Sequence, residues 1–216
     1  MTEATLQALD GIRDISDLKW YVIPLLALVF YVYTKEIGNA RRRNNWDVIF
    51  SGLIIFGLDF FNETWNGWLL HFSGYSAAWT TPGDTALRVT VGWNIEIIFM
   101  FLMVGIIYYN SLTDSQDKKI LGINEKWVWA GIYTVFCVFI EVVLNQADLL
   151  IWDYSWWSFS WGGIWLILVI GYGLFFFGAG AMLCLKTNKQ KITMISIVYA
   201  VPIIMTIIAA SLGFVY

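Results

Sequence analysis

The sequence is poor in charged residues, histidine, cysteine and proline. Only 13% of its 216 residues are charged and 59% are hydrophobic, which excludes a soluble domain of this length. The single histidine, His71, excludes zinc sites of the usual nitrogen and sulfur kinds, a bis-histidine haem and a multi-histidine di-iron centre. Cys137 and Cys184 both lie in apolar runs, so we expect apolar packing rather than a disulfide. We therefore predict no metal and no cofactor, with a carboxylate-only metal site as the minority alternative.

The sequence is rich in apolar runs of about 20 residues, and each is long enough to cross a bilayer as a helix. The predicted spans are residues 20–34, 47–70, 85–109, 127–151, 162–185 and 192–214. We read the chain as one transmembrane domain, 1–216, because no soluble domain is appended. The predicted fold is an all-α, polytopic membrane bundle of about six transmembrane helices with aromatic outer loops.

Lys and Arg concentrate on one side of this six-span arrangement. Ten of the thirteen basic residues lie in segments 35–46, 110–126 and 186–191. The positive-inside rule makes these segments cytoplasmic and places both termini outside. The sequence has no basic surface for binding nucleic acid. We expect the protein to lie in the cytoplasmic membrane of a bacterium or archaeon.

Three acidic residues lie within the predicted spans at nearly the same depth: Asp59, Glu96 and Glu141. Each is 13 or 14 residues from the aromatic residue at the cytoplasmic end of its span, or about 20 Å into the membrane. Ionised side chains at that depth are costly and normally face the bundle interior, where they indicate function. No Lys or Arg lies in these stretches to neutralise them.

Helical periodicity places further polar residues on the same faces as these acids. They are Asp59, Asn62, Glu63 and Asn66 in one span, and Glu141, Asn145 and Asp148 in another. We expect Asn145 to hydrogen-bond Glu141, and Asn62 or Glu63 to do so for Asp59. The predicted catalytic residues are Asp59, Glu63, Glu96 and Glu141. A structural alternative is that these groups only join helices, although amides would do that without an ionisation penalty.

Tryptophan gathers at the outer side of the membrane. Ten of thirteen tryptophans map there, more than an interfacial belt needs. Residues 152–161 are too aromatic for a solvated loop, so we expect them to fold back over the bundle as a lid with residues 71–75. The predicted substrate-binding residues are Asn62, Trp65, Asn66, Trp93, Asn145, Asp148, Trp156, Trp157 and Trp161.

Two segments share an acid, an aromatic loop and a Gly-Trp or Trp-Gly pair in the same order. They are residues 47–109 and 127–185, which we read as a possible parallel repeat of helical hairpins. The run Asn62-Glu63-Thr64-Trp65, with Gly171-Tyr172-Gly173 further on, is similar to small integral-membrane terpene cyclases of meroterpenoid and indole-diterpene pathways. That resemblance implies acid-initiated cyclisation by essential carboxylates. It departs from the family in lacking a seventh helix and a late-helix acid, so we do not count the chain as a member.

Acids beneath aromatic rings are suited to two kinds of chemistry. A buried neutral carboxyl can protonate an alkene while rings stabilise the cation that forms, which predicts an isomerase, cyclase or hydratase acting on an isoprenoid or other lipid. The same groups would suit a transporter or channel for a cation or proton, and a non-catalytic membrane assembly protein is a third alternative. The prolines are few, so the paired broken helices of transporters are not indicated. The acids are confined to the outer half, so no continuous polar path crosses to the cytoplasm, and we favour the enzyme. Expected partners are membrane lipids, a small apolar or cationic ligand, and a second copy of the chain.

Overall fold

The computed structural model describes residues 1–113 and 118–216, and it is built largely from helices. The long helices are α2 (Val22–Arg43), α3 (Asp47–Ser73), α4 (Ile95–Asn110), α5 (Glu125–Gln146) and α8 (Asn188–Ser211). A further helix is divided into α6 (Trp161–Leu166), the π-helical segment η2 (Ile167–Gly173) and α7 (Leu174–Leu183). The short elements are α1 (Glu3–Asp10), the 3-10 turn η1 (Ile15–Asp17) and the hairpin of β1 (Lys119–Ile120) and β2 (Ile123–Asn124).

Four of these helices are long and apolar enough to cross a membrane. They are α3, α5, α8 and the combined helix Trp161–Leu183. Helix α4 is also apolar but has only 16 residues. The prediction of an all-helical bundle with membrane-spanning helices is therefore confirmed at this level.

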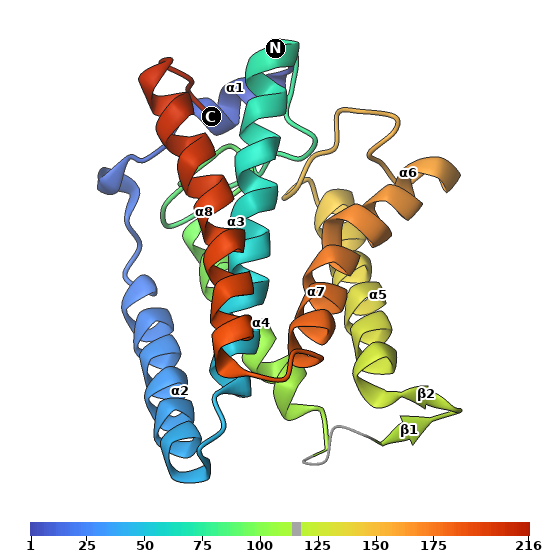
Figure 1. Cartoon of the computed structure of the whole chain (residues 1–216). Coiled ribbons are helices and arrows are strands. Elements are labelled where there is room, and N and C mark those ends of the chain that lie inside the picture. Colours follow the sequence, from blue (N-terminus) through green and yellow to red (C-terminus); the bar gives the residue numbers. More distant parts are fainter. Residues whose placement is uncertain (114–117) are drawn as a thin grey trace.

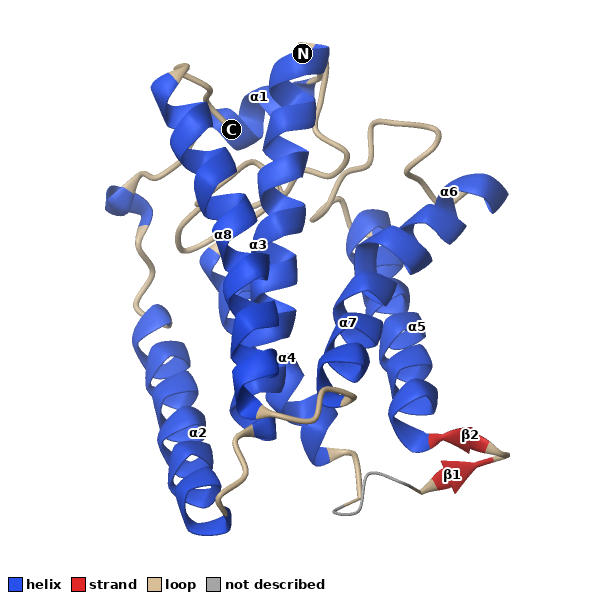
Figure 2. Cartoon of the chain, viewed as in Figure 1, coloured by secondary structure: helices blue, strands red, loops and turns tan. Residues whose placement is uncertain are grey.

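The long helices run side by side, and the two ends of the bundle differ in character. Both termini lie at one end, together with α1, and the β1–β2 hairpin lies at the other (Figures 1 and 2). The α2–α3 and α7–α8 connections share the hairpin's end. We call these the terminal end and the basic end, since the three segments rich in Lys and Arg meet at the latter.

Helix α3 is the centre of the bundle and packs against α2, α4, α7 and α8. The buried apolar core joins α3 to its neighbours through Phe50, Ile54, Ile55, Phe101, Phe176 and Met182. Lipid is as apolar as these side chains, so close packing rather than exclusion of water holds the helices together. Small residues permit this: a Cβ on Gly105 of α4 would lie 2.3 Å from the Ser51 carbonyl oxygen of α3.

Local sequence signals explain where the helices begin and end. The Asn94 side chain accepts from the backbone N–H of Ile97 at the start of α4, and Thr187 with Gln190 forms a capping box at the start of α8. Gly74 ends α3 in a left-handed conformation with φ of 59°.

Two connecting segments, residues 74–94 and 147–160, cover the terminal end of the bundle. They are joined by an antiparallel bridge in which Thr80 and Ile151 exchange backbone hydrogen bonds of 3.0 and 2.8 Å. The buried guanidinium of Arg88 holds the first segment by donating to the carbonyls of Thr81, Pro82 and Gly83. These covering segments deliver several aromatic side chains to the acids of α3 and α5.

The third helix is shorter than the sequence predicted. We expected a span over residues 85–109, whereas α4 begins at Ile95. Residues 85–94 are not helical because Arg88 pairs as an isolated bridge with Ile12 and Asn94. Tertiary pairing overrides the apolar character of this stretch, and the result moves Glu96 from the middle of a helix to its first turn.

Candidate functional site

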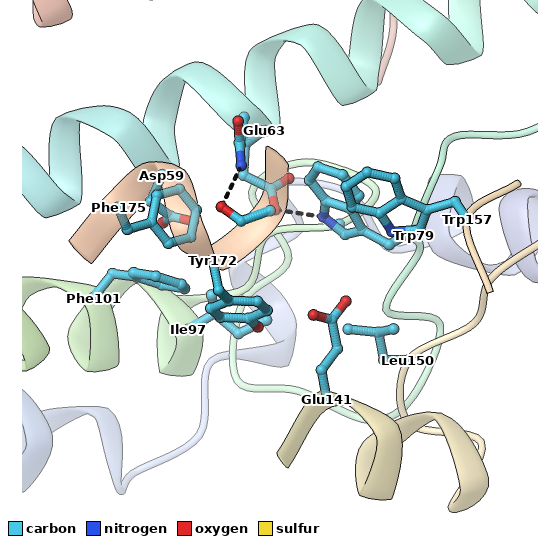
Figure 3. Close-up of a pocket in the computed structure, with 13 residues that line it drawn as sticks. Asp59, Glu63, Trp79, Ile97, Phe101, Glu141, Leu150, Trp157, Tyr172 and Phe175 are labelled. Atoms are coloured by element: carbon cyan, nitrogen blue, oxygen red, sulfur yellow. Dashed lines mark hydrogen bonds between the residues drawn. The ribbon is translucent and has the colours of Figure 1, made fainter. Parts of the chain in front are cut away.

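The polar face of α3 is buried in the middle of the protein. Asp59, Asn62, Glu63 and Asn66 are all at most 3% exposed. Glu141 of α5 is also buried. The predicted grouping of acids from these two helices is present in the structure: Asp59, Glu63 and Glu141 line one cavity (Figure 3).

Each of these three carboxylates accepts a hydrogen bond from a tryptophan indole. Trp93 donates to Asp59 across 2.9 Å, Trp79 to Glu63 across 2.7 Å, and Trp152 to Glu141 across 3.1 Å. Glu63 also accepts from the Thr90 hydroxyl. All four donors come from the two covering segments, so folding of those segments over the bundle is what orients the acids.

The cavity between the acids has a volume of about 50 Å³. Its lining residues are Asp59, Asn62, Glu63, Trp79, Gly92, Ile97, Phe101, Glu141, Leu150, Trp157, Gly171, Tyr172 and Phe175. One buried water needs about 10–15 Å³, so there is room for about three to five waters or for one small group of a ligand. An entire lipid does not fit.

No Lys or Arg occurs among these lining residues, within the part of the chain that the structure describes. Three acids at close quarters without a cation cannot all be ionised at low cost, because like charges repel and burial disfavours charge. We therefore expect at least one of the three carboxyl groups to be protonated. A protonated carboxyl group can donate a proton, whereas a carboxylate in an ordinary ion pair cannot.

The π-helical segment η2 forms part of the cavity wall and lies beside α3. Gly171 and Tyr172 line the cavity, and the Tyr172 side chain lies beside the Glu141 carboxyl group. The Asn62 amide donates toward the carbonyls of Ile170 and Gly171 over 3.4 and 3.5 Å. A π-helix leaves backbone groups out of the regular α pattern and often occurs at functional sites.

A second and larger space adjoins the first. An apolar groove of about 500 Å³ runs along α4 and α5 and includes residues of α2. Four residues line both spaces: Ile97, Phe101, Leu150 and Tyr172. The groove has the volume of a ligand site for a small molecule or lipid chain, and these four side chains form part of the wall of both spaces.

The structure does not bring Glu96 to the cavity, contrary to our expectation that it lies beside Asp59 and Glu141. Its carboxylate lies at the groove and accepts from the Tyr21 hydroxyl across 2.6 Å, from the Thr85 hydroxyl across 2.5 Å and from the Ala86 backbone N–H. These contacts tie α4 to the start of α2 and to the covering segment 74–94.

Two expected amide contacts also differ from the structure. Asn145 donates to the Leu150 carbonyl, where it closes the end of α5, and not to Glu141. Asn62 accepts from the Trp65 indole and does not bond Asp59 in the structure. Glu63 and Asp59 have separate tryptophan partners instead. The three acids thus have indole partners from the covering segments in place of the expected amide neighbours one helical turn away.

The predicted substrate-binding residues fall into three groups. Asn62 and Trp157 line the cavity, while Trp93 reaches it by binding Asp59. Trp65 and Asn66 support it: Trp65 packs edge-on against Trp79 and Trp157, and Asn66 bonds the backbone of Ala78 and Trp79. Asn145, Asp148, Trp156 and Trp161 lie away from it, and the last three are exposed, Trp161 by 84%.

Sequence reasoning did not select Trp79, Trp152 and Tyr172 as site residues, although they contact the acids. The first two belong to the excess of outer tryptophans, so their type and location were visible but their partners were not. In the described residues, no group of three or more His, Cys, Asp or Glu is arranged to hold a metal ion.

Comparison with known proteins finds a family match but no solved structure that resembles the chain. A model of an uncharacterized membrane protein family matches residues 2–211. An uncharacterized protein of Archaeoglobus fulgidus is 41% identical over 175 residues, which cover 81% of this chain and 80% of the relative.

Proposed function

The chain therefore belongs to this membrane protein family, and we propose that it is an intramembrane acid–base enzyme acting on an isoprenoid or other lipid. The observation that carries the proposal is the pairing of two spaces: a small cavity enclosed by three acids and a larger apolar groove that shares four wall residues with it. The groove would hold the lipid chain, and the reacting group would enter the cavity.

We further propose six membrane spans with both termini outside, in the cytoplasmic membrane of an archaeon or bacterium. The three basic segments gather at the end opposite the termini, in agreement with the positive-inside rule. Helix α2, with 22 residues, is about 33 Å long and α4, with 16, is about 24 Å. These would complete a set of six with the four long apolar helices.

In the proposed chemistry, one carboxyl group of the cavity donates a proton and another accepts one. Protonation of a double bond forms a C–H bond and a carbocation while the O–H bond of the acid breaks. Loss of a different proton to a neighbouring carboxylate gives an isomer and leaves the site with the same number of protons. Attack by a second double bond closes a ring and forms a new carbocation, which gives a cyclised product when it loses a proton to the carboxylate. Attack by a water from the cavity forms a C–O bond and an oxonium ion, which gives a hydrated product when its extra proton passes to the carboxylate.

The aromatic residues would serve the cationic intermediate. The faces of Trp79, Trp157 and Tyr172 lie around the cavity, and each ring can stabilise a nearby cation by about 0.5–2 kcal/mol. Their bulk would also limit access of external water, which matters because a carbocation reacts rapidly with it.

Transport of a proton or small cation is the second candidate, favoured by the water-sized volume of the cavity. A conducting path would need to continue toward the basic end. In the described structure the tightly packed residues Ile54, Ile55 and Phe176 occupy that direction on α3 and α7 and are fully buried. This packing supports the enzyme over the transporter.

Amide variants of the acids would test the proposal. Asp59→Asn, Glu63→Gln and Glu141→Gln keep shape but remove the transferable proton, so we expect loss of a lipid product in extracts of expressing cells while the thermal melts of the purified proteins change little. Asp148→Asn is the matched control, because Asp148 is exposed with φ of 56°, a conformation that Asn tolerates. Three variants with the wild-type lipid profile would refute the enzyme.

A further inference from the structure

One buried donor at the acid cavity has no acceptor. Trp157 is only 2% exposed, and its indole nitrogen is out of contact with solvent. In the described structure this nitrogen has no hydrogen-bond partner. Its ring lines the cavity and lies beside that of Trp79, with centroids 5.3 Å apart (Figure 3). Buried indole N–H groups usually have a partner, so this one is a position where a ligand can bind.

The neighbouring tryptophans make the exception clear. Trp79, Trp93 and Trp152 each donate to an acid, and Trp65 donates to the Asn62 side chain. Trp157 packs against two members of this group and alone among these five leaves its N–H unused.

Asn62 supplies a second donor that is only partly used. Its amide lies at 3.4 and 3.5 Å from the carbonyls of Ile170 and Gly171, beyond the usual range of about 2.7–3.2 Å for such bonds. Asn62 also lines the cavity. Two N–H donors with spare capacity at the wall of one small space indicate a ligand that accepts hydrogen bonds.

We infer that the cavity binds an oxygen atom of the substrate and that Trp157 positions this oxygen by donating its indole N–H. The inference rests on the proposed function and narrows the substrate class to lipids or isoprenoids that carry a carbonyl, ether, epoxide or hydroxyl group. A pure hydrocarbon has no acceptor for this donor. A bare metal or ammonium cation has none either, although the acids and rings would attract it.

The geometry of the two spaces agrees with a ligand of this kind. The cavity volume of about 50 Å³ suits a single small polar group, and the adjoining groove of about 500 Å³ suits an apolar chain. Ile97, Phe101, Leu150 and Tyr172 line both spaces, so the polar group would pass beside these side chains to reach Trp157.

The test compares two probes of equal chain length, a long-chain methyl ketone and the corresponding terminal alkene, on the detergent-solubilised full-length protein. We expect both to bind in the groove and to raise the melting temperature, with the ketone giving the larger rise. In an N–H correlation spectrum of protein with labelled tryptophan, the ketone should shift one indole signal downfield while the alkene leaves it in place. Trp157→Phe identifies that signal by its disappearance.

Trp157→Phe should also weaken ketone binding about threefold to tenfold and leave alkene binding unchanged. Trp68→Phe is the matched control. The Trp68 indole nitrogen is likewise buried without a partner, but its ring packs against Phe72 and Phe214 outside the cavity. This variant should bind both probes as the wild type does.

The outcomes separate the inference from the proposed function. Equal stabilisation of the wild type by ketone and alkene would overturn the oxygen site while leaving lipid binding in the groove intact, and this comparison needs no variant to fold. A preference for the ketone that persists in Trp157→Phe would also overturn it. Binding of neither probe would count against the proposed function itself.

Discussion

Trp93 donates its indole N–H to Oδ2 of Asp59 across 2.9 Å, while its ring stacks on Phe56 and Phe60 of the same helix. The centroid distances of 5.6 and 5.7 Å place Trp93 firmly against α3. A residue from a covering segment thus supplies the hydrogen-bond donor for an acid of the central helix. The site forms only when the terminal end of the bundle is closed.

Trp93→Phe would retain the stacking and remove the donor. We expect a loss of stability of about 1–3 kcal/mol, because a buried carboxyl group loses its partner, together with reduced formation of the lipid product. Thermal melts and lipid profiles measure the two effects. Trp161→Phe, at an exposed ring, is the control, and equal behaviour of the two variants would contradict a role for the indole.

The variant Glu96→Gln should distinguish the structural role of Glu96 from the catalytic role proposed for the acids of the cavity. Its carboxylate accepts from Tyr21, Thr85 and Ala86, and an amide offers one oxygen in place of two. We expect a lower melting temperature with product formation retained per folded molecule. Loss of product formation with an unchanged melting temperature would contradict this and indicate that Glu96 is catalytic.

Lys191 and Asp47 form a buried ion pair at the basic end, with 2.5 Å between Nζ and Oδ1. Lys191→Met would leave Asp47 without its partner, and breaking such a pair destabilises by about 3–5 kcal/mol. The exposed neighbour Lys189→Met is the control and should change the melt little. Adding Asp47→Asn to Lys191→Met should recover part of the loss, since no unpaired charge then remains.

Gly105→Ala should be destabilising because the new Cβ would meet backbone atoms that cannot move aside, the Ser51 carbonyl oxygen at 2.3 Å and the Gly52 Cα at 2.8 Å. Overpacking of this kind costs about 1–3 kcal/mol. Gly131→Ala on α5 meets nothing within 4 Å and should be neutral or stabilising by up to about 1 kcal/mol through helix propensity. In thermal melts run together, Gly105→Ala should have a lower melting temperature than the wild type. Gly131→Ala should have an equal or higher one.

Cysteine labelling would test the proposed orientation. In a background with Cys137 and Cys184 replaced by Ala, Glu3→Cys should react with an impermeant thiol reagent added to intact cells. Lys189→Cys should react only after the membrane is opened, because residue 189 is in the first turn of α8, which begins at the basic end. Labelling of position 189 but not of position 3 in intact cells would contradict the proposed orientation.

Much of the fold was accessible from the sequence because the signals are local. Apolar runs of about 20 residues and breaks between them marked the long helices, and helical spacing placed Asp59, Asn62, Glu63 and Asn66 on one buried face. The start of α4 was missed because residues 85–94 are apolar enough for a helix but are held by pairing with Ile12 and by contacts of Arg88.

The sequence by itself determined that this is a helical membrane protein with acids buried in it, since hydropathy and period depend only on neighbours along the chain. The tertiary structure decided which acids meet: Asp59, Glu63 and Glu141 share a cavity, while Glu96 faces elsewhere. It also decided that Trp79, Trp93 and Trp152 bind those acids and that Trp157 binds none. These contacts join distant segments, and their geometry depends on how α3, α5 and the two covering segments pack, which no local pattern records.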